Sequence, residues 1–139
     1  MMNQIERIAS GEQLIAMIIR DRDYPPETTF YTPDHSTMQV GHVVYLKGGR
    51  IPPHKHLPLE RSIVGTPETL IVRQGKVEVE LFDDDEKLLV QTVLTEGDAI
   101  LLLGGAHGFR ILEDAVLFEI KQGPYTGLKE KEHIHDPSQ

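Results

Sequence analysis

The sequence predicts an all-β protein, either a barrel or a sandwich of short antiparallel strands. Nine prolines and twelve glycines are spread along the chain and divide it into short apolar segments bounded by turn residues. The stretch "KVEVEL" at 76–81 alternates with a period of two, which is typical of a strand with one buried face. These two observations predict the fold class before any motif is considered.

Length and composition limit the protein further. The 139 residues suggest one domain that can bury a core without disulfides or structural metals. The absence of cysteine excludes disulfides, thiolate ligands and cysteine nucleophiles, so a metal would have nitrogen and oxygen ligands. A net charge of −8 argues against a nucleic-acid partner. The apolar runs are too short for a membrane span and the first residues do not resemble a signal peptide, so we expect a cytoplasmic protein.

The first half of the chain gives three segments. Residues 12–21, "EQLIAMIIRD", form an apolar run that could be a strand or a short helix. Residues 22–36 contain three prolines and indicate a loop. Residues 37–47, "TMQVGHVVYLK", predict a strand that ends at the turn Gly48-Gly49.

The second half predicts a succession of strands joined by turns. We expect turns at Gly75, at the acidic stretch 83–87, at Gly97-Asp98, and at a second acidic stretch before residue 115. The tail from Gly123 is polar and is expected to be irregular. The strands predicted between these turns cover residues 68–74, 76–82, 88–94, 99–103, 107–112 and 115–121.

Two titratable residues are expected to point into the core. A strand that starts at Glu68 places its carboxylate on the same face as Leu70 and Val72. A strand that starts at His107 places the imidazole on the face of Phe109 and Ile111. Because a buried, unpaired carboxylate is costly, Glu68 needs a partner, and a cation would serve.

A pair of histidines could complete a metal site. His54 and His56 are separated by one residue, with prolines on both sides, and would point the same way if the segment is extended. Alone, such a pair is more often part of a surface turn. With Glu68 and His107 it gives three imidazoles and one carboxylate, a set that suits zinc, manganese, iron, nickel or cobalt.

The spacing of these residues resembles the two motifs of the cupin superfamily of small β-barrels. Gly48 is followed by five residues and then His54-Lys-His56, and Glu68 is followed by six residues and then Gly75, as in the first motif. Gly97-Asp98 and His107 resemble the second motif. The gap of eleven residues between His56 and Glu68 is longer than in the family and indicates an insertion over 57–67. In the second motif Leu103 replaces the usual proline, the run to His107 is one residue short, and the trailing asparagine is absent.

The resemblance covers about residues 40–121. It implies a cupin-type antiparallel β-barrel, also called a double-stranded β-helix or jelly roll, in a single domain over 1–139. The N-terminal extension would be 1–36, the barrel core 37–122 and the tail 123–139. It further implies one divalent transition-metal ion held by His54, His56, Glu68 and His107. Glu60 is a rival to Glu68, because it follows His56 at the family's own spacing, although it lies in a loop-like stretch.

Further residues could act on a substrate. Glu119 and Lys121 are two apart on one strand, so they could form a surface ion pair or line the barrel mouth as candidate catalytic residues. Gln39, Arg61 and Phe109 are candidate substrate-binding residues; a guanidinium at Arg61 would suit a carboxylate or phosphate.

The remaining histidines and acids favour ordinary surface roles. His133 and His135 repeat the spacing of the first pair, but no strand or glycine framework supports them, so we expect tail residues. The three aspartates at 83–85 are expected to be a solvated turn.

Three functions are compatible with the sequence. The first is a metal-dependent isomerase, lyase or dioxygenase acting on a small polar molecule such as a sugar or keto-acid derivative. The resemblance also extends, weakly, to small single-domain bacterial cupins of surface-polysaccharide and sugar-nucleotide contexts. The second is a non-catalytic module that binds or senses a small molecule. The third is a metal-free sugar epimerase. We also expect a homodimer in which the apolar segment 12–20 pairs across the interface.

Overall fold

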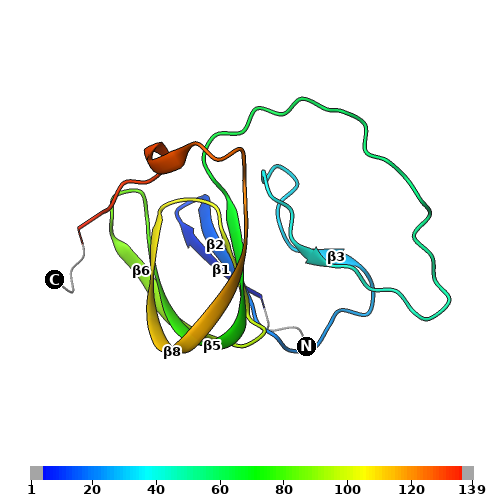
Figure 1. The fold of residues 1–139 in the computed structure, drawn as a ribbon, viewed down its shortest axis with the longest axis horizontal. Coiled ribbons are helices and arrows are strands. Elements are labelled where there is room, and N and C mark those ends of the chain that lie inside the picture. The colour runs from blue at the N-terminus through cyan, green and yellow to red at the C-terminus, as the bar shows by residue number, and fades with distance from the viewer. Residues whose placement is uncertain (1–4, 136–139) are drawn as a thin grey trace.

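The protein is an all-β chain whose main sheet is antiparallel and curled into a half-barrel, as the sequence predicts (Figure 1). The computed structural model describes residues 5–135, and no α-helix occurs among them. The elements are β1 (Ile5–Ser10), β2 (Gln13–Ile19), β3 (Thr29–Phe30), β4 (Gly41–His42), β5 (Glu68–Phe82), β6 (Leu88–Thr95), β7 (Ala99–Leu102), β8 (Ala106–Lys121) and the short 3₁₀ helix η1 (Gly127–Glu130). Within this described range, no helix has the length and apolarity needed to cross a membrane.

The long strand β5 is the centre of the sheet. The strand order is β1-β2-β7-β5-β6, and β8 pairs with the opposite edge of β5 along its whole length. The first half of β5 pairs with β7 and the second half with β6. Residues 68–71 and 76–82 of β5 therefore have a strand on both sides.

The strand β5 is continuous, whereas the sequence predicts a turn at Gly75. Instead of turning, the chain shifts its register against β8 between Val72 and Val77. This irregularity changes the parity of the strand, so that Leu70 and Val72 before it and Val79 after it all face the same core. Gly75 has a φ of +87°, and a Cβ there would collide with the carbonyl oxygen of Asp114.

The strand β8 is continuous for the same reason. The sequence predicts two strands, 107–112 and 115–121, separated by an acidic turn. In the structure β8 runs from Ala106 to Lys121 and follows the bend of β5 at Glu113 and Asp114. Two long strands therefore bend together. The turns predicted at Gly75 and before residue 115 do not occur, and the short strands predicted on either side of each are continuous.

The strand β2 explains why the segment 12–21 shows no alternation. Ala16 and Ile18 belong to the main core, while Met17 and Ile19 pack with Leu101 in a second cluster on the opposite face. Tyr31, Met38 and Val40, which lie between β3 and β4 in the chain, cover this second cluster. Both faces of β2 are buried, and so a continuous apolar run is what the strand requires.

This position also corrects the expected dimer contact. β2 pairs with β1 on one side and with β7 on the other. The segment 12–20 thus has no free backbone edge to offer to a second copy.

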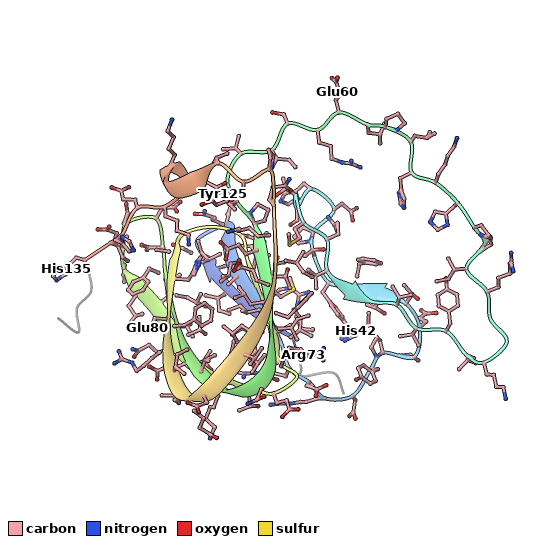
Figure 2. All side chains as sticks on the ribbon, in the orientation of Figure 1. His42, Glu60, Arg73, Glu80, Tyr125 and His135 are labelled. Carbon is pink, nitrogen blue, oxygen red and sulfur yellow. The ribbon has the colours of Figure 1, made fainter. Side chains whose placement is uncertain are left out.

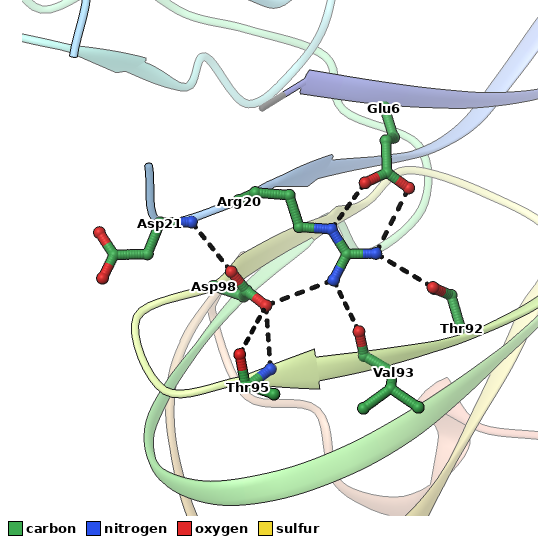
Figure 3. A network of polar contacts seen from close by, with 7 residues as sticks. All are labelled: Glu6, Arg20, Asp21, Thr92, Val93, Thr95 and Asp98. Atoms are coloured by element: carbon green, nitrogen blue, oxygen red, sulfur yellow. Dashed lines mark hydrogen bonds and ion pairs between the residues drawn. The ribbon is translucent and has the colours of Figure 1, made fainter. Parts of the chain in front are cut away.

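A single arginine closes the curl of the sheet (Figure 3). Arg20 follows β2, and its guanidinium contacts Glu6 on β1 at 2.6 Å and the carbonyl oxygen of Val93 on β6 at 2.6 Å. It also lies 3.3 Å from Asp98, which is 6% exposed and accepts hydrogen bonds from the backbone N–H groups of Asp21 and Thr95. The network joins the first and last strands of the sheet order, β1 and β6.

The segment between β4 and β5 lies outside the half-barrel. The sequence predicts a strand over 37–47, but only Gly41–His42 is paired, with β3. Residues 45–62 are all exposed, and the segment arcs away from the sheet (Figure 1). A tract that long without regular structure is uncommon in a compact domain.

We expect Arg20→Met to lower the free energy of unfolding by about 2–4 kcal/mol, because Asp98 would keep a buried charge without its cation. Urea unfolding at neutral pH measures the change. The matched control is Arg22→Met at an exposed position, for which the change should stay within about 0.5 kcal/mol. Equal effects of the two substitutions would contradict a closing role for Arg20.

Substitutions at two glycines distinguish the cost of backbone strain from the cost of a steric clash. Gly48 and Gly75 both have φ near +90°, but only Gly75 has backbone atoms where a Cβ would be placed. We expect Gly48→Ala to cost about 1 kcal/mol of strain, and Gly75→Ala to cost at least about 2 kcal/mol more through overpacking. Chemical unfolding of both variants tests this; a difference near zero would mean that the β5–β8 bend tolerates a side chain.

Candidate functional site

The bend of β5 and β8 brings distant parts of the two strands together. His107 is opposite Leu81 in the register and Glu68 is opposite Lys121, so the two side chains belong to opposite ends of the β5–β8 ladder. Even so, His107 Nε2 lies 3.8 Å from Glu68 Oε2. The side chains are 32% and 14% exposed, respectively. They meet at the open end of the curl, which we call the mouth.

Two further predicted residues lie at the mouth. Glu119 is opposite Leu70, and Lys121 is opposite Glu68. Their side chains form an ion pair of 3.8 Å, and both interact electrostatically with Glu68. Phe118 and Ile120 point to the other face of β8, where they are exposed. Glu68, His107, Glu119 and Lys121 form the mouth cluster.

Burial shifts the pKa values of Glu68 and His107 in opposite directions. Desolvation raises the pKa of Glu68, and the neighbouring carboxylate Glu119 raises it further, against the opposing charges of Lys121 and Lys131. Desolvation lowers the pKa of His107 below its ordinary value of 6.5, with Lys131 acting in the same direction and Glu119 against it. At neutral pH His107 is therefore mainly an uncharged imidazole with a free lone pair.

Phe109 supports His107. The two rings lie edge to face with centroids 6.2 Å apart, and Phe109 packs against the main core. Phe109 therefore lies beside the mouth cluster, on the same strand, where it orients the imidazole.

The histidine pair of the first motif lies elsewhere. His54 and His56 are exposed on the 43–67 segment, with ring centroids 5.3 Å apart, and His54 Nδ1 is 2.8 Å from the carbonyl oxygen of Pro52. The structure does not bring them to Glu68 and His107. Over residues 5–135, no three histidine or acidic side chains are close enough together to hold a metal ion. Glu60, the rival ligand, is also exposed on this segment (Figure 2).

Gln39 and Arg61 line a different hollow. This open depression of about 1050 Å³ lies between the 34–39 turn, residues 59–63 and Gln122. The Gln39 amide is already engaged within its own loop. It accepts a hydrogen bond from Thr32 at 2.7 Å and donates to the carbonyl oxygens of Pro33 and Ser36. Gln39 therefore holds the turn together, while Arg61 remains on an exposed rim.

The tail contributes residues that sequence reasoning assigned to solvent. After β8 the chain crosses above the mouth (Figure 1). The charge of Lys131, in this tail, acts to lower the pKa of both Glu68 and His107. Residues 132–135 and His107 line a small cavity of about 230 Å³, together with Glu80, Phe82, Ala106 and Gly108. The repeated His-x-His spacing was the one signal in the sequence that could have drawn attention to this tail.

The raised pKa of Glu68 predicts a pH-dependent gain from Glu68→Gln. Because the folded-state pKa lies above the ordinary value of 4.5, ionising Glu68 destabilises the fold, and its stability contribution is lost as the pH rises through the folded pKa. The variant should gain stability relative to the wild type above that pKa and none below 4.5. Unfolding curves from pH 4 to 8 test this. Glu96→Gln, at an exposed turn position, should show no such trend.

Comparison with known proteins returns no relative. No family model, no curated protein and no solved structure matches the chain. A proposal for the function therefore rests on the residues of the mouth and their geometry.

Proposed function

We propose that the protein is a metal-dependent enzyme of the cupin type that acts on a small polar molecule, such as a sugar or keto-acid derivative. The observation that carries the proposal is the pairing of His107 with Glu68 at the mouth, 3.8 Å apart and partly buried. Perturbed titratable groups gathered in one concave place are typical of functional sites. The curled antiparallel sheet is compatible with a jelly roll of this type.

The donor pair fits a divalent transition metal. Two ligand atoms that are each about 2.0–2.2 Å from one ion are at most about 4.4 Å apart, so the 3.8 Å between His107 Nε2 and Glu68 Oε2 would allow both side chains to hold the same ion. The uncharged His107 imidazole has its lone pair available, and a cation would relieve the cost of ionising Glu68. His54 and His56, which lie apart from the mouth and are exposed on the 43–67 segment, would have to reach the mouth to supply the remaining nitrogen ligands. When bound, the ion would polarise a substrate carbonyl or hydroxyl group.

The other two members of the cluster would act on the substrate. Lys121 would hold an anionic group of the substrate next to the ion, because its ammonium lies on the same strand face as Glu119, 3.8 Å away. Glu119 would accept a proton from the substrate, since its carboxylate lies beside Glu68 and Lys121 and a positioned carboxylate can serve as a general base. Phe109 would provide an apolar wall beside His107.

A second candidate is a metal-free acid–base site. The same pairing favours it, because Glu68 with a raised pKa can donate a proton while His107 with a lowered pKa can accept one. This arrangement would suit an epimerase that removes and returns a proton on a small sugar derivative. The metal content of the protein separates the two candidates.

Elemental analysis of protein purified without chelators tests the first candidate. We expect close to one transition-metal ion per chain, and we expect His107→Ala to weaken metal affinity at least about 100-fold, since even residues outside the ligand shell cost 10–100-fold. His35→Ala is the matched control, because His35 is exposed on the 34–36 turn.

Two outcomes would overturn the metal-dependent proposal. One is metal-free wild-type protein that also fails to take up zinc, manganese, iron, nickel or cobalt in titration. The other is equal metal affinity of His107→Ala and the wild type. Turnover of a sugar derivative by metal-free protein, lost in both Glu68→Gln and His107→Ala, would establish the second candidate instead.

A further inference from the structure

The strand β8 has a long uncovered edge. Of the described strands, only β5 pairs with it, although β8 is sixteen residues long. Its outward face carries the exposed apolar side chains of Val116, Phe118 and Ile120. Native proteins usually cover or block such an edge because its free N–H and C=O groups can pair with another chain.

The 43–64 segment also pairs with no strand among the described residues, and so it could cover the free edge of β8. Apart from a turn at Lys47-Gly48 the segment has no regular structure, nearly all of it is exposed, and it includes large exposed apolar side chains, namely Val43, Tyr45, Leu46, Ile51, Leu57, Leu59 and Val64. So many exposed apolar groups in one segment indicate an interaction surface. The start of the segment is held by its own copy, because Met38 and Val40 pack on the second cluster and Met38 Sδ accepts a hydrogen bond from Thr69.

Charge favours an acidic partner for this segment. Residues 43–64 contain four basic residues and one acid, a net charge of +3. Since the whole chain carries −8, the rest of it carries −11. The segment is thus electrostatically complementary to the remainder of a second copy of the same chain.

We propose that the 43–64 segment of a second copy adds to the edge of β8 and places its His54 and His56 at the mouth beside Glu68 and His107. The exchange is reciprocal, so that a two-fold symmetric dimer holds two composite sites. The ligand set rests on the proposed metal-dependent function, whereas the docking surface stands on the strand edge, the apolar side chains and the charge.

The occupant is a second copy because the segment extends away from its own half-barrel. Residues 45–62 are exposed throughout and arc outward (Figure 1). Neighbouring residues of a strand direct their N–H groups to opposite sides, so Pro52 and Pro58 can face away from β8 and prevent a further strand from pairing there, while Pro53 leaves one hydrogen bond to β8 unmade. The assembly therefore closes at two copies.

Light scattering coupled to size exclusion tests the docking surface without reference to metal. We expect a wild-type dimer, and we expect Phe118→Lys to weaken dimerisation at least about 30-fold, as for a central interface residue. The exposed Phe118 side chain makes the substitution tolerable in the monomer. Leu88→Lys, at an exposed position on β6, is the matched control and should stay dimeric. A monomeric wild type, or a dimer unaffected by Phe118→Lys, would overturn the proposal.

A mixing experiment tests whether the site is shared between copies. One variant carries His54→Ala and His56→Ala, the other Glu68→Ala and His107→Ala, and neither should bind zinc tightly alone. After unfolding and refolding together, each mixed dimer regains one intact site, roughly a quarter ion per chain for random assortment. No recovery, with wild type that binds zinc, would mean that the segment closes on its own copy. Wild type that takes up none of zinc, manganese, iron, nickel or cobalt would refute the metal function, while the light-scattering result would still decide the docking surface.

Discussion

The closure of the sheet by Arg20 and Asp98 is the constraint on which the other features depend. The guanidinium joins β1 to β6, and Asp98 ties the turn before β7 to the end of β2. An open antiparallel sheet of this size would leave one face of β2 and β5 in water. Closing the curl instead puts that face around a single apolar core of isoleucine, valine and leucine side chains.

The same curvature produces the candidate site. Glu68 and His107 are distant along the β5–β8 ladder, and only a bent ladder lets their side chains approach to 3.8 Å. The register shift at Gly75 allows the bend while both halves of β5 keep their apolar faces inward. The core and the mouth are therefore two results of one deformation of the sheet.

The sequence predicted the all-β class, because that class depends on local alternation, and alternation also singled out Glu68, His107, Glu119 and Lys121 as candidate residues; the grouping of these four without His54 and His56 was not predicted. Period-two spacing placed Glu68 with Leu70 and Val72, and it placed Glu119 with Lys121. Spacing could not predict the continuity of β5 and β8, because a glycine at a bulge and a glycine at a turn look alike in one sequence. The course of residues 43–67 was not predictable either, since strand propensity does not decide whether a partner strand is present.

The bulge around Gly75 has a mechanical consequence for the mouth. Gly75 lies seven positions after Glu68 in β5, which gives an arm of about 23 Å at the usual rise of a strand. A change of only about 5° in the bend would move the tip of that arm by about 2 Å, comparable to the length of a metal–ligand bond. The distance between Glu68 and His107 therefore depends on the bend angle at Gly75, a residue without a side chain. Sequence changes far from the mouth that alter this angle would change the chemistry there while leaving every residue of the cluster intact.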